Sequence, residues 1–189
     1  MKKVFVLILM FFVMTGLHAQ EQWSFGPRIG MGFSKNYYSH YYSNNIIGLF
    51  GEFRVNKIAT ELDVLFTKQG TFNATYQCAV IPLKFKYYPR LNDGFNIFAG
   101  PQLTMYKEEP ARIIMSGGPY DYHYNKTTAA IIVGLGYRTK IGLDIAFNYN
   151  HGLVDINKEK HWGKKWRERV FQITAAYDLC QLFKAGKNK

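Results

Sequence analysis

The sequence predicts an all-β fold, an eight-stranded antiparallel up-and-down β-barrel that crosses a membrane. Eight segments alternate between apolar and polar residues with a period of two. Each is about ten residues long, the length of a tilted strand in a bilayer. The connections between them are short and long in turn, which is the layout of outer-membrane barrels.

The predicted strands, in chain order, are 23–33, 46–55, 59–68, 79–88, 95–106, 129–139, the first half of 142–156, and 169–179. In the same order, the apolar residues that define one face of each strand are Phe25, Ile29 and Met31; Ile47, Leu49 and Phe53; Leu62, Val64 and Phe66; Ile81, Leu83 and Phe85; Phe95, Ile97 and Leu103; Ile131, Val133 and Leu135; Leu143, Ile145 and Phe147; and Phe171, Ile173 and Tyr177. Short connections are expected at 56–57, 89–94 and 140–141, and long ones at 34–45, 69–78, 107–128 and 151–168. With the N-terminus in the periplasm, the long connections are extracellular.

The opposite face of these strands carries charged residues in equal numbers of each sign. They are Arg28, Arg54, Lys84, Lys86 and Arg138, against Glu52, Glu61, Asp63, Asp144 and Asp178. An eight-stranded barrel has a narrow interior, which the large apolar residues of all eight strands would overfill. The apolar face is therefore expected to meet lipid and the charged face to line the lumen. There the charges must pair, because an unpaired buried charge costs several kcal/mol.

Three prolines, Pro27, Pro82 and Pro101, lie inside predicted strands. A closed barrel has no edge strand, so each proline removes a hydrogen bond from the ladder between strands. We expect a β-bulge or a strand end at each of them.

The N-terminus is typical of a secretory signal peptide over residues 1–19, which leaves residues 20–189 as the predicted barrel domain. Lys2 and Lys3 precede an apolar run over 4–16, and this run is short for a transmembrane anchor, which is the alternative. Export and barrel together predict the outer membrane of a bacterium as the location.

The chain is basic and rich in aromatic residues. Its formal net charge is +11 and aromatic residues make up 17% of it. A basic exported protein suits anionic lipid phosphates rather than nucleic acid, and aromatic side chains concentrate at membrane interfaces. Cys78 and Cys180 are expected at opposite rims of the barrel, too far apart to form a disulfide.

Three motifs resemble the PorT-like outer-membrane β-barrel family of Gram-negative bacteria. "AVIPLKFKYYP" at 79–89 is similar to the fourth strand of that family, "FNIFAGPQLTMY" at 95–106 to the next strand, and "YNHGLVDI" at 149–156 to the end of the seventh. The resemblance covers essentially the whole exported chain and implies an eight-stranded barrel. It fixes no activity, although the member that gives the family its name is linked to protein secretion and gliding.

The connection 158–169 combines basic residues with tryptophans, which suits lipid phosphates at the membrane interface. Its candidate contacts are Lys158, Lys160, Lys164, Lys165, Arg167, Trp162 and Trp166. A solvated loop is the alternative interpretation. The predicted partners are outer-membrane lipid and lipopolysaccharide, together with a protein of the envelope.

The histidines do not define a catalytic site. His123 could form an acid–base pair with Asp121 at the barrel mouth, but a polar loop residue is the plainer interpretation, as it is for His151 and His161. No His-x-x-x-His or Cys-x-x-Cys spacing supports a metal, and no cofactor is expected.

The sequence therefore predicts a small barrel with a charge-plugged lumen and no catalytic residues. It would act through extracellular loops or partner contacts, as a component of secretion or of the envelope. Two alternatives remain: an outer-membrane enzyme acting on lipid or peptide, and a secreted soluble ligand-binding barrel.

Overall fold

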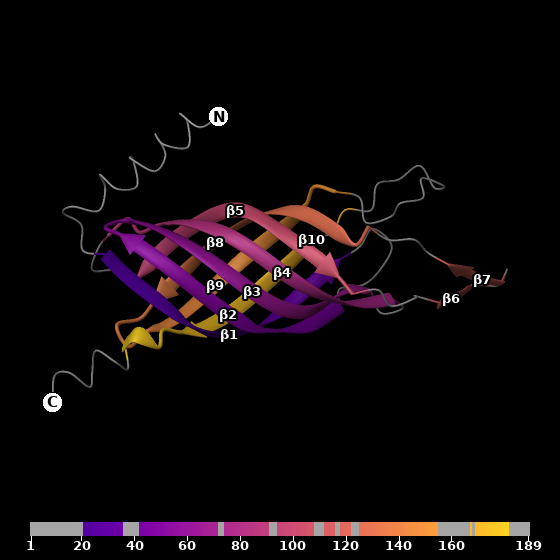
Figure 1. The fold of residues 1–189 in the computed structure, drawn as a ribbon, viewed down its shortest axis with the longest axis horizontal. Coiled ribbons are helices and arrows are strands. Elements are labelled where there is room, and N and C mark those ends of the chain that lie inside the picture. Colours follow the sequence, from indigo (N-terminus) through magenta and orange to yellow (C-terminus); the bar gives the residue numbers. More distant parts are fainter. Residues whose placement is uncertain are drawn as a thin grey trace, which may run out of the picture.

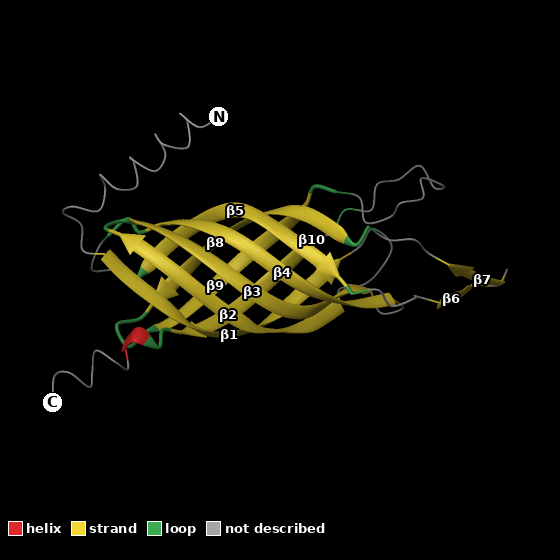
Figure 2. Cartoon of the chain, in the orientation of Figure 1, coloured by secondary structure: helices red, strands yellow, loops and turns green. Residues whose placement is uncertain are grey.

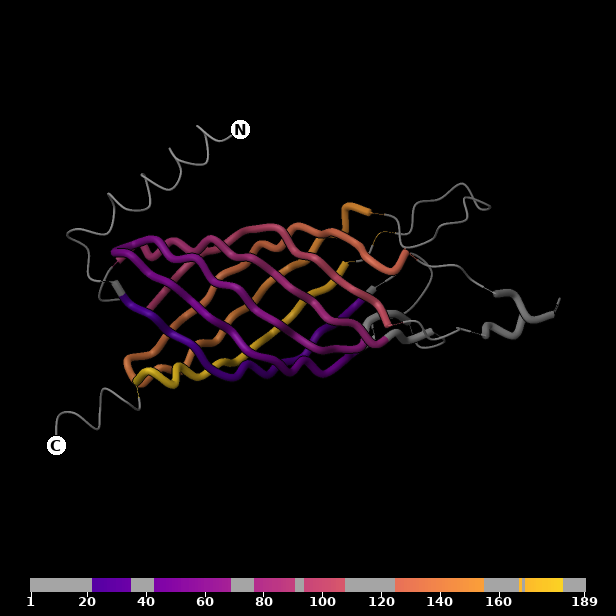
Figure 3. Tube along the Cα trace, in the orientation of Figure 1, coloured from indigo at the N-terminus to yellow at the C-terminus, as the bar shows by residue number. Residues whose placement is uncertain are grey.

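Eight long strands close into one antiparallel barrel (Figures 1 and 2), which confirms the predicted fold class. The computed structural model describes residues 21–35, 42–71, 74–90, 94–107, 112–115, 118–121, 125–154, 167 and 169–181. The barrel strands are β1 Glu21–Lys35, β2 Tyr42–Val55, β3 Ile58–Thr71, β4 Ala74–Tyr87, β5 Phe95–Tyr106, β8 Thr127–Arg138, β9 Leu143–Gly152 and β10 Arg169–Tyr177. Their order around the barrel is β1-β10-β9-β8-β5-β4-β3-β2, and β1 pairs with both β2 and β10. The Cα trace in Figure 3 shows the strands crossing the barrel obliquely, as closure requires.

The two ends of the barrel differ in their connections. At one end the chain enters β1 and leaves β10, and β2 turns into β3 through Asn56 and Lys57. Asn56 has a φ of 54°, and Gly142, in the turn between β8 and β9, has a φ of 90°. Asn and Gly adopt such left-handed conformations readily. Following the layout of outer-membrane barrels, with short turns and both termini on the periplasmic side, we call this the periplasmic end and the other the extracellular end.

All four predicted long connections contain strand residues: 34–45 and 151–168 only at their ends, 69–78 and 107–128 more extensively. β3 and β4 stay paired as far as Thr71 and Ala74, so the prediction of a loop over 69–78 was wrong. This stretch follows the apolar residues of β3, so it lacks the alternation on which the prediction depended. The predicted loop 107–128 contains a small hairpin of β6 (Arg112–Met115) and β7 (Gly118–Asp121), which lies beyond the end of the barrel in Figure 1.

The two faces of the barrel wall have opposite compositions. Outward-facing Leu49 and Phe66 are 64% and 57% exposed, whereas inward-facing Glu61 and Asp63 are fully buried. A water-soluble barrel would turn its apolar face inward. The exposed apolar belt therefore argues against the secreted soluble barrel and matches the predicted lipid-facing phase.

The prolines interrupt pairing without shifting it. The pairing between β3 and β4 stops beside Pro82 and then resumes in the same register. The pairing between β4 and β5 stops beside Pro101 and also resumes in the same register. The expected bulge or strand end is therefore wrong at these two positions. Pairing of β1 with β10 begins at Arg28, so Pro27 lies just outside that ladder, but β1 itself continues to Glu21 and Pro27 pairs with Leu49 of β2, which is neither a strand end nor a bulge.

Outside the strands, a helical turn at Cys180 and Gln181 follows β10 (red in Figure 2). None of the helical structure in the described ranges is long and apolar enough to cross a membrane. Cys78 lies in β4 and Cys180 lies past the end of β10, and no disulfide joins them. This agrees with their predicted places at opposite rims.

Candidate functional site

The periplasmic half of the lumen is filled by four cations and four carboxylates, which we call the ion cluster. Its members are Arg28, Lys84, Lys86, Arg138, Glu52, Glu61, Asp63 and Asp144. All are buried except Arg138, whose side chain is 10% exposed. Their formal charges sum to zero, which is the condition for keeping so many ionised groups out of water.

Strand alternation and register bring these side chains together. On β3, Glu61 and Asp63 point inward on either side of Leu62. Glu61 lies directly opposite Lys84 on β4 and opposite Glu52 on β2. Two carboxylates placed opposite each other repel, so this pair needs a shared cation.

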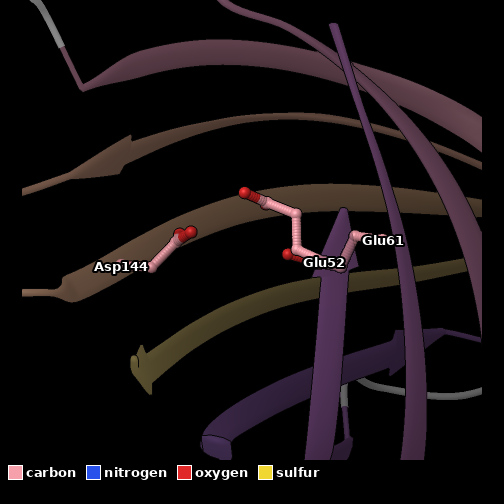
Figure 4. A group of neighbouring side chains, drawn as sticks. All are labelled: Glu52, Glu61 and Asp144. Carbon is pink, nitrogen blue, oxygen red and sulfur yellow. The ribbon is translucent and has the colours of Figure 1, made fainter. Parts of the chain in front are cut away.

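Lys86 supplies that cation. Its Nζ lies 2.9 Å from Glu52 Oε2, 2.5 Å from Glu61 Oε2 and 3.4 Å from Asp144 Oδ2. These three carboxylates come from β2, β3 and β9 (Figure 4) and offer oxygens within 4.8 Å of one another. Such a group could hold a metal ion by geometry, but here one ammonium already contacts all three carboxylates. The arrangement is that of an internal ion-pair plug.

The remaining cations extend the cluster in two directions. Arg28 Nη1 lies 2.9 Å from Glu61 Oε1 and 2.8 Å from Asp63 Oδ2, and Lys84 Nζ contacts the same two oxygens. Toward the periplasm, Arg138 binds both oxygens of Glu52 at 2.6 and 2.9 Å. It also donates to Asp144 Oδ2 at 2.8 Å. Bidentate pairs of this kind are the stronger and more directional ion pairs.

Two members of the predicted charged set lie at the edge of the cluster. Arg54 is half-buried, with its guanidinium 3.7 Å from the Tyr88 ring centroid and its Nε donating to the Asn56 carbonyl. Asp178 accepts hydrogen bonds from Ser24 Oγ at 2.9 Å and from the Cys180 backbone N–H. The contacts that the structure gives these two are thus with neutral groups, unlike the ion pairs predicted for them.

Aromatic residues belong to the site, and the sequence reasoning missed them. The Tyr88 hydroxyl donates to Glu52 at 3.3 Å, and burial raises the pKa of Tyr88 to about 12, so it remains a donor. Arg28 lies 5.1 Å from the ring centroid of buried Phe50. Lys84 lies 5.4 Å from that of buried Phe98. Phe50 and Phe98 fall on the same alternating phase as the charges, which was the available signal.

The extracellular half of the lumen is filled differently. Its buried polar residues among the described ones are neutral: Ser34, Asn44, Thr67, Gln102, Thr104, Thr128, Asn148, Asn150 and Gln172. Asn148 Nδ2 donates to Gln172 Oε1 at 2.8 Å. A cavity lined in part by Gln102 and Asn150 has a volume of about 10 Å³, at the lower limit for one water molecule.

Most residues of the predicted lipid-contacting connection lie outside the described residues: Lys158, Lys160, Lys164, Lys165, Trp162 and Trp166. Arg167 is exposed. His123 and His161 also lie outside the described residues. His151 lies in β9, where its Nδ1 is 3.4 Å from the Tyr149 hydroxyl. It pairs with Ile131 and Arg169, both exposed, so it is on the outer wall and not in the lumen.

The comparison with protein families identifies the class of barrel. The model for the outer membrane protein β-barrel domain matches residues 5–178. The chain belongs to this family. Membership, together with the apolar outer wall, places the protein in the outer membrane. A search of curated proteins found no matching relative.

Several solved structures resemble this chain in fold. The structure of Neisserial surface protein A matches with a TM-score of 0.52 and 11% identity, covering 84% of this chain and 99% of that one. The attachment invasion locus protein Ail of Yersinia pestis matches with a TM-score of 0.48 and 13% identity, covering 86% and 100%. The N-terminal β-barrel domain of Pseudomonas aeruginosa OprF matches with a TM-score of 0.42 and 12% identity, covering 84% and 100%. At these identities the likeness concerns the fold alone.

Proposed function

We propose that this family member is a closed, non-conducting barrel that acts through its extracellular loops or through contacts with envelope partners. The observation that carries the proposal is the ion cluster, a charge-neutral set of eight side chains that crosses the lumen. Solute transport needs a continuous water-filled path. The ion cluster blocks such a path in the periplasmic half, and the neutral residues fill the other half.

The extracellular end is where this barrel departs from a minimal one. β3 and β4 continue to Thr71 and Ala74, and the β6–β7 hairpin lies beyond the barrel. The periplasmic turns, by contrast, are short. We infer that recognition of a partner takes place on the extracellular side, and that the barrel is the anchor for it. The three sequence motifs that resemble PorT-like barrels support a role in secretion or in the envelope.

An enzyme acting on lipid or peptide is the weaker candidate. It would need an acid, a base and a nucleophile that converge at one rim. In the described part of the chain, the single histidine, His151, is on the outer wall, and the buried carboxylates are held in ion pairs. Neither arrangement offers a general base near a surface that substrate could reach.

Planar-bilayer recording tests closure. The refolded protein, with its insertion verified by flotation of proteoliposomes, should give no steady conductance under conditions where an open porin does. The filled lumen is the physical reason. Steady channel currents from the wild-type protein would overturn the proposal.

Genetic complementation tests the location of the function. Replacing Arg112–Asp121 by a short Gly-Ser linker should leave a folded barrel, judged by heat-modifiable electrophoretic migration, that no longer corrects the envelope defect of a deletion strain. The matched control is Lys140→Gln in a periplasmic turn, which should complement fully. Full complementation by the linker variant would remove the hairpin from the function.

A further inference from the structure

A groove lies on the outer wall of the barrel, near the extracellular ends of β2, β3, β4 and β5. It has a volume of about 880 Å³. Its outward-facing lining includes Asn45, Phe66, Lys68, Gln77, Met105 and Lys107. The lining residues include two lysines and no carboxylate, so the groove is positively charged.

The strand register sets the upper row of the groove. Lys68 on β3 lies opposite Gln77 on β4. The backbone N–H of Lys107 donates to the Gln77 carbonyl at 2.9 Å, which places Lys107 beside Gln77 on the other side. Adjacent strands lie about 4.8 Å apart, so the two lysines stand roughly 10 Å apart with an amide between them. Their long side chains can converge on one anion above Gln77.

A second row lies one step toward the membrane centre. Phe66 is opposite Ala79, and Ala79 is opposite Met105. Phe66 and Met105 are 57% and 41% exposed, and the small Ala79 between them forms a notch. On β3, the outward positions below Lys68 are all apolar from Phe66 to Leu62. The polar row therefore marks the upper edge of the apolar belt, at the depth of lipid headgroups.

We propose that this groove binds one phosphorylated lipid of the outer leaflet. Its phosphate lies between Lys68 and Lys107 over the Gln77 amide, and an acyl chain runs down the notch at Ala79 between Phe66 and Met105. The argument is complementarity: cations and an amide donor at headgroup depth, with an apolar channel directly below. Ammonium groups bind phosphate as point charges.

A second groove on the opposite wall provides an internal comparison. It has a volume of about 430 Å³ and spans β8, β9 and β10. Its lining includes Val133, Phe147, Tyr149 and Phe171 but no charged residue. It can accept an acyl chain but has no group for a phosphate. The proposed selectivity for phosphorylated lipid therefore belongs to the β2–β5 wall.

Native mass spectrometry of the full-length refolded protein tests the site. The protein is released from micelles that contain phosphatidylcholine and increasing amounts of diphosphoryl lipid A. We expect a one-to-one complex whose affinity falls at least tenfold in the double variant Lys68→Gln, Lys107→Gln. The matched control, Lys57→Gln with Lys140→Gln, removes the same charge from two exposed periplasmic turns and should bind within twofold of wild type. Equal weakening in both double variants, or no weakening in the first, would overturn the proposal.

Two further measurements separate the headgroup from the acyl chain. Lipid A without its phosphates should bind wild-type protein as weakly as the diphosphoryl form binds the lysine variant. Ala79→Phe, which fills the notch and keeps both lysines, should also weaken binding. Millimolar inorganic phosphate should not displace the lipid, and displacement by it would indicate a site for free phosphate. None of these results depends on whether the lumen conducts.

Discussion

The periplasmic and extracellular halves of the lumen are both closed, but by different chemistry. In the periplasmic half, each charge contacts at least two groups of opposite sign, and Glu61 contacts Arg28, Lys84 and Lys86. In the extracellular half, amides and hydroxyls form hydrogen bonds between neutral groups beside an apolar cluster that includes Ile46, Leu65 and Val80. Removal of one buried charge leaves other charges without compensation, whereas removal of one amide leaves only one or two neutral groups without a hydrogen bond. The two halves should therefore respond very differently to similar substitutions.

The largest effect is expected from Glu61→Gln in the ion cluster. The substitution keeps the shape but removes the charge shared by three buried cations. We expect a loss of about 3–5 kcal/mol in the free energy of unfolding, measured by urea titration of the protein in lipid vesicles. The matched control is Thr60→Val, the exposed neighbour on the other face of β3, which should change stability by less than about 0.5 kcal/mol. Similar losses in both variants would remove the special role of the ion cluster.

A substitution at Gly100 tests how closely β4 and β5 approach each other where their pairing is interrupted. A Cβ at this position would lie 1.9 Å from the Leu83 carbonyl oxygen, whereas a Cβ at Gly51 would meet no atom within 4 Å. Gly100→Ala should destabilise the barrel by about 3 kcal/mol, at the upper end for overpacking. Gly51→Ala should be neutral or mildly stabilising. The same urea titration compares them, and equal stability of the two variants would contradict the close approach.

A smaller effect is expected from Asn148→Ala in the extracellular half. The substitution removes the 2.8 Å donor of the buried Gln172 amide oxygen and the longer, 3.3 Å donor of Asn150 Oδ1, at a cost of about 1–2 kcal/mol. Adding Gln172→Leu should recover part of that loss, because it removes one of the two acceptors that lost their donor and leaves only Asn150 Oδ1 without the Asn148 amide. A double-mutant cycle measures the coupling. If the second substitution lowers the free energy of unfolding further, apolar side chains cannot take the place of the neutral polar residues in the extracellular half of the lumen.

The smallest effect is expected from Tyr88→Phe. The variant loses the hydroxyl that donates to Glu52 at 3.3 Å and keeps the ring on which Arg54 rests. Glu52 retains Arg138 and Lys86, so the free energy of unfolding should fall by only about 0.5–1 kcal/mol. Tyr88→Ala, which also removes the ring, should cost clearly more. Equal losses would mean that the ring contributes nothing to the periplasmic edge of the cluster.

Strand alternation in the sequence was sufficient to predict which face of each strand meets lipid. Leu143, Ile145 and Phe147 alternate with Asp144 and Ala146 in the printed sequence, and the structure places the first set outward and the second inward. Period-two patterning carries this information because a strand has only two faces. The alternation stops where the strands leave the membrane. The sequence therefore did not predict the extensions of β3 and β4 or the β6–β7 hairpin.

The sequence by itself determined the class of barrel, the equal numbers of charges on its inner face and the connections through its short turns. Tertiary structure alone decided which charges meet. Lys86 contacts acids from β2, β3 and β9 because closure and strand tilt bring distant strands to one level of the lumen, and Arg54 instead meets Tyr88 at the rim. Pairing of neighbouring strands also places Lys68, Gln77 and Lys107 in one row, from β3 across β4 to the end of β5. Register between strands is a property of their pairing and of the shear of the barrel, which no single strand encodes.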